Sequence, residues 1–227
     1  MSFDRLAWHY RWMEAVLAGG LLQRCRTRWL AEVPTASNVL LVGEGHGRML
    51  EACARTMPQA RFTVLDQSAA MLDQARRRWR KIGTHQNITF QQTDLRTWRH
   101  TGAPFDLIVS NFFLDCFSPE ELPRVIANIG AASAPTASWL VSDFIVPAAG
   151  WKRLRAQLVL ALAYGFFRVA TDISARRIVN PEGFLQQQDF QLQRRERFNH
   201  ELLQADLWQR LAPKPKTQDA VSLGKPT

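Results

Sequence analysis

The sequence has few cysteines, and none of them is placed for a metal or a disulfide framework. Its 227 residues include three, at Cys25, Cys53 and Cys116. They are widely spaced and belong to no Cys-x-x-Cys pair or histidine-rich cluster, which argues against a zinc site and against structural disulfides. We expect three ordinary buried thiols and no bound metal.

The sequence also lacks a secretory signal and any stretch that resembles a linker. The absence of a basic start followed by a short apolar run and a small-residue cleavage site predicts a cytoplasmic location. A chain of 227 residues is long enough for one filled α/β core. We predict one domain over residues 1–211, with a helical cap at 1–33 and a lid insertion at 151–178. The tail at 212–227 is polar and rich in Lys and Pro, so we expect disorder there.

Acidic residues are in the minority, and the formal net charge is +9. The densest basic cluster, Arg76–Lys81, is of a kind found in nucleic-acid-binding proteins. It also ends the helix expected after Asp66, where cations stabilise the last carbonyls. Aromatic residues do not form a stacking ladder. We therefore do not expect a nucleic-acid partner, and an anionic membrane surface or an acidic small substrate explains the charge at least as well.

What the sequence does contain is a glycine-rich turn after a buried strand. Val39–Val42 is typical of a strand buried on both faces, and three alternate glycines follow it, Gly43, Gly45 and Gly47. Arg48–Arg55 continues as a helix whose first turn is expected to aim unpaired N–H groups at a ligand. A second apolar run ends in Asp66, placed to accept hydrogen bonds from both hydroxyls of a ribose. The pattern predicts a nucleoside site.

The glycine spacing differs from the Gly-x-Gly-x-x-Gly of dinucleotide-binding folds. It resembles motif I of the class I S-adenosylmethionine-dependent methyltransferases, in particular the small-molecule, quinone-biosynthesis-like type. Asp66, then Asp94 after the strand-like Ile88–Phe90, then Phe105–Asn111, which resembles motif IV, follow in the family's order. The resemblance implies a doubly wound, Rossmann-like α/β fold with a seven-stranded sheet and an antiparallel last strand. Asp189–Phe198 and Glu201–Leu211 are the candidates for its final strands, although Leu202–Trp208 is also compatible with a helix.

The resemblance also implies S-adenosylmethionine as cofactor and assigns residues to it. The glycine turn would face the methionine part, Asp66 the ribose and Asp94 the adenine amino group. Asn111 would help to hold the amino acid moiety, and Tyr10 would close over the cofactor from the cap. The neighbouring side chains that we predict in the same site are Gln67, Met71 and Leu95.

One position departs from the family pattern. An acidic residue usually stands two positions before the first glycine, near the methionine ammonium, and this chain has Leu41 there. Glu44, inside the turn, either supplies the missing negative charge or points to solvent.

No side chain identifies itself as a catalytic base, and methyl transfer needs one only when the acceptor must lose a proton. His9 is a candidate base, or else a structural histidine. Asp115 binds the substrate or orients His9, or it is a charge at a helix N-terminus. We expect Phe112 and Tyr164 to contact the substrate. The stretch Ser110–Asp115 lacks the Asn/Asp-Pro-Pro-aromatic motif with which related enzymes methylate bases and glutamine.

The segment Trp151–Ala170 carries the apolar run Leu158–Phe167. This run is shorter than the about 20 residues that a membrane-spanning helix needs. Its position in the chain is that of an insertion over the substrate pocket in small-molecule members of the family. A lid is our first interpretation, a core helix the second and peripheral membrane contact the third. An apolar lid favours a small, largely apolar or aromatic acceptor. The alternatives are a non-catalytic partner or regulatory subunit and, less favoured, an RNA methyltransferase.

Overall fold

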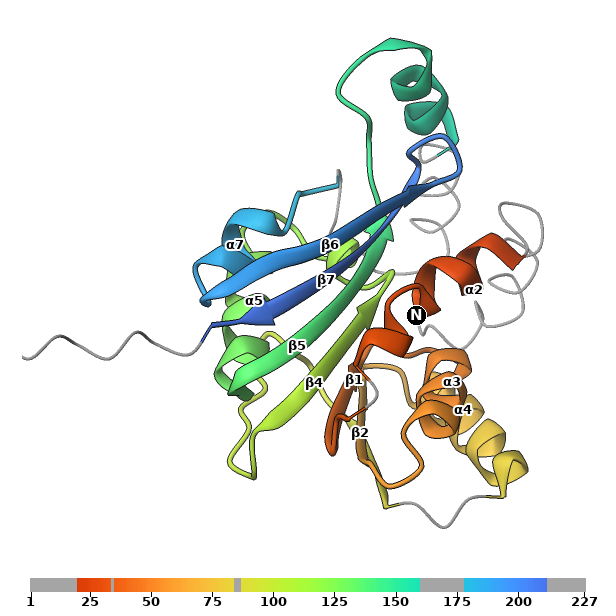
Figure 1. Cartoon of the computed structure of the whole chain (residues 1–227), viewed down its shortest axis with the longest axis vertical. Coiled ribbons are helices and arrows are strands. Elements are labelled where there is room, and N and C mark those ends of the chain that lie inside the picture. Colours follow the sequence, from red (N-terminus) through yellow and green to blue (C-terminus); the bar gives the residue numbers. More distant parts are fainter. Residues whose placement is uncertain (1–19, 34, 84–86, 160–177, 212–227) are drawn as a thin grey trace, which may run out of the picture.

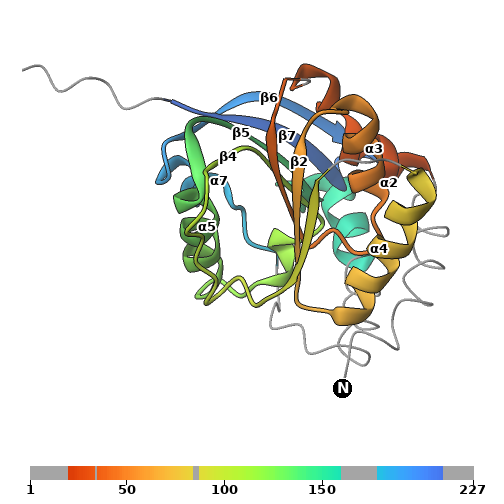
Figure 2. The ribbon, with the colours of Figure 1, turned by 90° about the horizontal axis from the view of Figure 1, so that it is seen from below.

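The protein is a three-layer α/β structure. The computed structural model describes residues 20–33, 35–83, 87–159 and 178–211. Figure 1 shows a twisted sheet with helices on both faces. In Figure 2 three helices cover one face, α2 (Gly20–Thr27), α3 (Arg48–Thr56) and α4 (Ala69–Ile82), and two cover the other, α5 (Leu122–Ala131) and α7 (Glu182–Gln186). The predicted doubly wound fold is confirmed.

The sheet has seven strands in the order β3-β2-β1-β4-β5-β7-β6. The strands are β1 (Asn38–Val42), β2 (Arg61–Asp66), β3 (Ile88–Gln92), β4 (Phe105–Asn111), β5 (Ser133–Phe144), β6 (Phe190–Phe198) and β7 (Leu203–Arg210). Strands β1 to β5 pair in parallel, and β7 runs antiparallel to both β5 and β6. The final segment, which the residue pattern left open between helix and strand, is thus the antiparallel strand that the resemblance implied.

The apolar run of β1 is buried because both faces of the sheet are covered. Val39 and Leu41 belong to the core under α2, α3 and α4, whereas Leu40 and Val42 belong to the core under α5. Alternate side chains of a strand point to opposite faces, so a central parallel strand needs apolar residues at every position. This is why Val39–Val42 could be predicted as a buried strand without an alternating pattern.

The strand order reverses between β1 and β4. In open α/β sheets, ligands bind at the carboxyl ends of the strands at such a switch point. Val42 pairs with Ser110 in the register of β1 and β4, so the glycine turn after β1 and Asn111 at the end of β4 are neighbours. The topology therefore brings motif I and the motif IV-like segment to one edge of the sheet.

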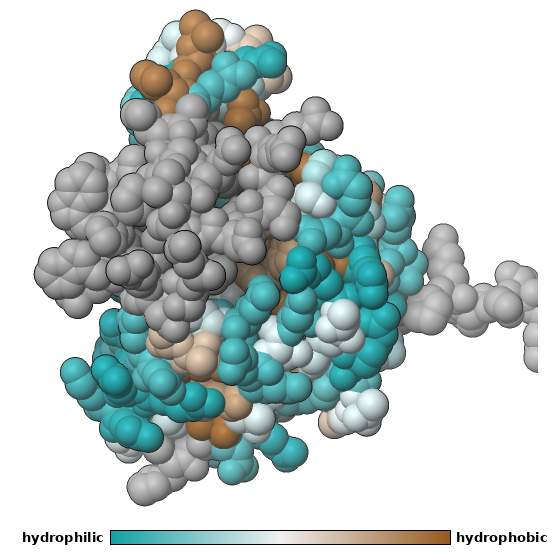
Figure 3. Space-filling view, turned by 180° about the vertical axis from the view of Figure 1, so that it is seen from behind, coloured by the Kyte–Doolittle hydropathy of each residue, from teal (hydrophilic) through white to brown (hydrophobic). Residues whose placement is uncertain are grey.

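Only the first part of the predicted lid belongs to the described residues. Residues 150–159 are helical and project beyond the sheet at the top of Figure 1. Trp151, Leu154 and Leu158 are 60%, 70% and 64% exposed, and Figure 3 shows hydrophobic side chains gathered at this end of the molecule. On its inner side Ala156 packs against Leu202, in the β6–β7 turn. This part of the segment is not a core helix.

Other sequence-based predictions fall on residues outside the described ranges. These are the roles of His9, Tyr10 and Tyr164, the first 19 residues of the cap, residues 160–177 of the lid and the tail at 212–227. Within the described ranges, no helix combines the length and the apolar character needed to cross a membrane. Cys25 and Cys53 are buried as predicted, and Cys116 is partly buried.

Candidate active site

The glycine turn after β1 has a left-handed backbone at each glycine, but the surroundings differ. Gly43 has φ +63°, and a Cβ there would overlap the ring of Phe113. Gly45 has φ +62°, and the neighbour found among the described residues is the Met71 sulfur, 4.0 Å from the Cβ position. Gly43 is therefore required by packing within the protein, whereas the described residues leave space over Gly45.

Asp66 lies at the carboxyl end of β2 and holds the glycine turn. Its two carboxylate oxygens accept hydrogen bonds from the Gly45 N–H at 3.3 Å and from the Ser68 N–H at 2.9 Å. Burial raises the pKa of Asp66, while these N–H groups and that of Gln67 oppose the rise. Because a carboxylate offers about four acceptor positions, Asp66 keeps capacity for the hydroxyls of a ribose.

Glu44 is partly buried against the start of α3, and its carboxyl turns toward the N–H groups of that helix and not toward solvent. Its Oε1 accepts hydrogen bonds from the N–H groups of Met49 at 2.8 Å and Leu50 at 3.0 Å. The solvent-facing alternative is wrong, and so is the prediction that the first turn of α3 leaves its N–H groups to a ligand, at least for these two residues. Burial raises the pKa of Glu44 from 4.5 to about 7. Leu41 packs in the core, so this position contributes no charge.

Asp94 follows β3, as predicted, but its carboxylate is held by an arginine. Arg96 donates from Nε to both Asp94 oxygens at 3.0 Å and from Nη2 to Oδ2 at 2.7 Å. The same guanidinium donates to Glu121 at 2.8 Å. The Arg96 guanidinium lowers the pKa of Asp94. An adenine amino group would therefore share this carboxylate with Arg96.

Asn111 ends β4 with a side-chain amide for which no hydrogen-bond partner is found in the described ranges. Both its Nδ2 and its Oδ1 are buried and lack a partner within the described part of the chain. An unsatisfied buried amide costs roughly 1–3 kcal/mol, so native structures rarely leave one without a ligand or water. The next residue, Phe112, has φ +53° and its ring packs against Phe144. Asn111 is the clearest sign that this edge of the sheet is built to receive a polar molecule.

The remaining predicted cofactor neighbours lie around the same edge. The Gln67 carbonyl accepts a hydrogen bond from Gln92, and the Met71 side chain lies nearest to Gly45. Leu95 is buried, and its carbonyl accepts a hydrogen bond from Asn128 at 2.8 Å. Gly47 has φ +80° and lies 3.1 Å, measured from its Cβ position, from the α4 backbone at Ala75. This third glycine allows α4 to approach the turn.

Asp115 is paired with a residue that the sequence analysis missed. It lies in a short 3-10 helix, η3 (Leu114–Cys116), and is hydrogen-bonded to the carboxyl of Asp143 near the end of β5. Both are buried, at 8% and 7% exposure. Burial and the neighbouring Asp115 carboxyl raise the pKa of Asp143. The signal for Asp143 was present, because it is an acid that ends an apolar strand, as Asp66 is.

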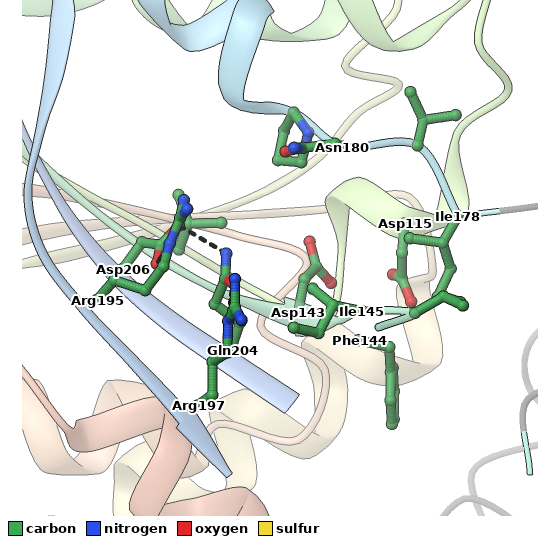
Figure 4. Close-up of a pocket in the computed structure, with 14 residues that line it drawn as sticks. Asp115, Asp143, Phe144, Ile145, Ile178, Asn180, Arg195, Arg197, Gln204 and Asp206 are labelled. Atoms are coloured by element: carbon green, nitrogen blue, oxygen red, sulfur yellow. Dashed lines mark hydrogen bonds and ion pairs between the residues drawn. The ribbon is translucent and has the colours of Figure 1, made fainter. Parts of the chain in front are cut away.

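The two acids line a cavity of about 220 Å³ between the ends of β5, β6 and β7 and the segment Ile178–Pro181. Figure 4 shows them at one side of this cavity and the pair Arg195–Asp206 at another. Arg195 donates to both Asp206 oxygens, at 2.9 and 2.8 Å, and to Glu182 at 3.0 Å. The cavity therefore has a polar floor assembled from residues far apart in the sequence.

The structure thus brings most of the described site residues together at the carboxyl ends of the strands. Gly45, Asp66, Met71 and Asn111 surround the turn after β1, while Asp115 lies beyond β4. Phe112 packs against Phe144 rather than among the residues that line the cavity.

Comparison with known proteins agrees with this arrangement. Residues 39–136 match the sequence profile of a methyltransferase domain family. Over 77 residues the chain is 39% identical to a release factor glutamine methyltransferase from Chlorobaculum tepidum, covering 33% of this chain and 26% of that one. Over 105 residues it is 37% identical to a trans-aconitate 2-methyltransferase from Paracidovorax citrulli, covering 44% of this chain and 38% of that one. The chain thus matches well under half the length of these curated relatives.

A solved structure extends the likeness to the whole fold. The magnesium protoporphyrin IX methyltransferase of Synechocystis PCC 6803, with bound S-adenosylhomocysteine, superposes with a TM-score of 0.61 at 18% identity. The superposition covers 83% of this chain and 81% of that one. Residues 39–136 are therefore similar to a methyltransferase domain, and the chain shares the fold of this solved methyltransferase.

Proposed function

We propose that this protein transfers a methyl group from S-adenosylmethionine to a small-molecule acceptor. The observation that carries the proposal is the Asn111 amide at the end of β4, whose buried atoms have no partner among the described residues, beside the glycine turn. A structural neighbour binds S-adenosylhomocysteine on the same fold. These features support a cofactor site at the switch point between β1 and β4.

The residues at this edge fit the parts of the cofactor. Asp66 would accept hydrogen bonds from the ribose hydroxyls, and the Asn111 side-chain amide would form hydrogen bonds with the amino acid moiety. Asp94 would accept the adenine amino group with the lone pairs that Arg96 leaves, alongside Gln67, Met71 and Leu95. Tyr10 would close the site from the cap. When bound, the cofactor supplies a methyl group on a sulfonium, and the chain's own contribution is alignment and exclusion of water.

The acceptor would lie beyond β4 and β5. The cavity there has apolar walls, including Val141, Ile145 and Val146, and a floor of carboxyl and guanidinium groups. An acceptor with an apolar body and one polar end fits this lining. The apolar run of the lid is consistent with that body, with Tyr164 and Phe112 as further candidate contacts and His9 as a candidate base.

Isothermal calorimetry with S-adenosylhomocysteine tests the cofactor site. We expect binding by the full chain and a loss of about tenfold or more for Asp66→Ala, the cost of a charge-assisted hydrogen bond. Asp73→Ala is the matched control, because Asp73 is an exposed acid on α4 that pairs only with Arg76 among the contacts found. No binding by the wild-type chain, or equal binding by Asp66→Ala, would refute the proposal.

A second candidate is a methyltransferase-fold subunit without catalysis. Two observations favour it: Leu41 provides no acid for the methionine ammonium, and Glu44 is engaged with the first turn of α3. Transfer of a labelled methyl group from S-adenosylmethionine to any metabolite of a cell extract would exclude this candidate.

A further inference from the structure

The helix that begins the predicted lid turns its apolar face away from the protein. Trp151, Leu154 and Leu158 are three and four positions apart, so they share one face of the helix over residues 150–159. Each of them is more than half exposed, and we call them the outer stripe. The opposite face carries Ala156, which is buried against Leu202. A helix on the surface of a globular protein usually has the reverse arrangement, with its apolar stripe toward the core.

Polar contacts hold the helix in this orientation. Lys152 forms an ion pair with Glu201 in the turn between β6 and β7. Arg155 donates to the backbone carbonyl and the side-chain oxygen of Asn199 in the same turn, at 3.3 and 2.9 Å. Rotation of the helix to bury the outer stripe would break these contacts. The exposure of the outer stripe is therefore built into the way the helix is docked.

The charge around the outer stripe is positive. The helix and the turn on which it packs, residues 150–159 and 197–202, contain one acid, Glu201, and four cations, which are Lys152, Arg153, Arg155 and Arg197. Glu201 is shared between Lys152 and Arg197. Arg155 is held by neutral acceptors, and the contact found for Arg153 in the described ranges is the carbonyl of Ala148. Most of this positive charge is thus not neutralised by the described residues.

An exposed apolar patch of this kind marks a membrane or a protein interface. A symmetric contact with a second copy of the chain would set the same four cations against each other, which is unfavourable. An anionic phospholipid surface matches both features. Tryptophan and leucine side chains enter the boundary between head groups and acyl chains, and lysine and arginine side chains are attracted to anionic head groups.

We propose that the helix over residues 150–159 binds the surface of an anionic phospholipid membrane through the outer stripe and the cations beside it. The helix lies on this surface, because no helix in the described ranges is long and apolar enough to cross a bilayer. Figure 1 shows the helix projecting beyond the end of the sheet, where a flat surface can meet it without touching the strands. This inference goes beyond the proposed function and does not depend on it.

Co-sedimentation of the full chain with vesicles tests the proposal. The probes are vesicles of phosphatidylcholine alone and vesicles of equal parts phosphatidylcholine and phosphatidylglycerol. We expect the mixed vesicles to bind the chain at least about tenfold more tightly, because each lysine or arginine near an anionic surface contributes about fivefold. Added salt should weaken this binding, since it screens the charges.

Serine substitutions test the outer stripe. Leu154→Ser and Leu158→Ser should each lower the affinity for mixed vesicles by about five- to tenfold, because a leucine side chain no longer leaves water on binding. Leu211→Ser is the matched control. Leu211 is also an exposed leucine, at 43%, but it follows the opposite end of β7 from the β6–β7 turn, so this variant should bind like the wild type.

A matched pair of arginine variants tests the charge. Arg153→Gln should lower the affinity for mixed vesicles by about fivefold. Arg80→Gln removes the same charge from an exposed position on α4 and should bind like the wild type. Because both arginines are exposed, this comparison stays informative even if a serine variant is unstable. Equal affinities of the two arginine variants would contradict a membrane site at the helix.

Three other outcomes would also overturn the proposal. The first is a wild-type chain that binds neither kind of vesicle or binds both equally well. The second is wild-type affinity in both Leu154→Ser and Leu158→Ser. The third comes from analytical ultracentrifugation without lipid: a wild-type dimer that Leu154→Ser converts to a monomer would assign the outer stripe to an interface between two copies of the chain.

Discussion

The two halves of the sheet's carboxyl edge are built in different ways. At the carboxyl ends of β1, β2 and β3, it consists of a glycine turn, single carboxylates and backbone N–H groups that follow directly after short apolar strands. Around the ends of β4, β5, β7 and β6, it consists of two buried acids and a network around Arg195. The residues of this half lie up to 91 positions apart in the sequence, from Asp115 to Asp206. The first half is local in the sequence and the second is not.

This difference explains what each half offers to chemistry. A nucleoside cofactor presents the same ribose and base to every enzyme of the fold, and a turn with one acid is enough to hold them. An acceptor must be distinguished from its analogues, which calls for buried polar groups with defined partners. Under the proposed function, the acids Asp115 and Asp143 and the arginine held by Asp206 would be groups of that kind. Four substitutions test the contrast.

Gly43→Ala should cause the largest loss of stability, because Gly43 packs against Phe113 between the two halves. The new Cβ would overlap the Phe113 ring and stand at φ +63°. Overpacking and left-handed strain together predict a loss of about 3–5 kcal/mol in the free energy of unfolding. Urea denaturation measures it. Gly83→Ala is the matched control, since Gly83 has φ +67° and no described residue within 4 Å of its Cβ position, and it should cost about 1–2 kcal/mol. Equal losses would show that Phe113 moves aside freely.

Asp206→Ala should cause the second largest loss of stability, and it changes the second half alone. Asp206 is buried and holds Arg195 through two hydrogen bonds. Removing one partner of a buried pair predicts a loss of about 3 kcal/mol in the free energy of unfolding. Asp73→Ala removes an exposed pair with Arg76 and should cost under about 0.5 kcal/mol. S-adenosylhomocysteine affinity should stay unchanged in the folded variant, and a large fall would contradict the separation of the halves.

Glu44→Gln should have a smaller effect that depends on pH. The pKa of Glu44 is raised in the folded chain to about 7, so its contribution to stability is complete below pH 4.5 and is lost as the pH rises through 7. Glutamine keeps an oxygen for Met49 and Leu50 but has no charge to bury. Urea denaturation between pH 5 and 8 should therefore show the variant gaining stability relative to the wild type as the pH rises.

The surface variant Glu32→Gln serves as the control for that measurement and should follow the wild-type curve. A constant difference between Glu44→Gln and wild type at every pH would contradict a titrating buried carboxyl. A fall in S-adenosylhomocysteine affinity in Glu44→Gln would support the other role predicted for this residue, the charge near the methionine ammonium.

Arg96→Ala should have the smallest effect on stability, although it links the halves. Arg96 joins Asp94 to Glu121 through ion pairs that are more than a third exposed on the arginine side, so we expect a loss under about 1 kcal/mol. The informative readout is S-adenosylhomocysteine affinity, which should change about two- to fivefold if Asp94 holds the adenine, the effect of a partly exposed charge pair. Arg99→Ala is the control. No change would remove Asp94 from the cofactor site.

The sequence predicted where the residues of the first half lie, because that follows from their position in the chain. Gly43, Gly45 and Asp66 come directly after apolar runs, and parallel strands bring their carboxyl ends to one edge whatever the rest of the chain does. The burial of Glu44 was not predictable in the same way. Whether an acid in a turn faces solvent or its own helix depends on where α3 begins relative to the turn, which is set by its packing on β1 and α4.

The second half shows why a site can escape such reasoning. Asp115 was recognised only as one acid with several possible roles, and its partner Asp143 was not singled out. Two acids 28 positions apart line one cavity only because β5 lies next to β4 in the sheet, with Asn111 paired to Ser142. The arginines came from β6, a strand whose alternating pattern predicted its conformation but not its partners.

The amino-acid sequence by itself determined the fold class and the edge of the sheet at which the glycine turn and Asp66 meet, because these follow from apolar runs and the residues that end them. Tertiary structure alone decided which carboxylates remain available. It committed Glu44 to a helix and Asp94 to Arg96, and it joined Asp115 to Asp143 in a buried cavity. The physical reason is that hydrogen-bond partners and desolvation depend on neighbours in space, and strand order, rather than sequence distance, sets those neighbours.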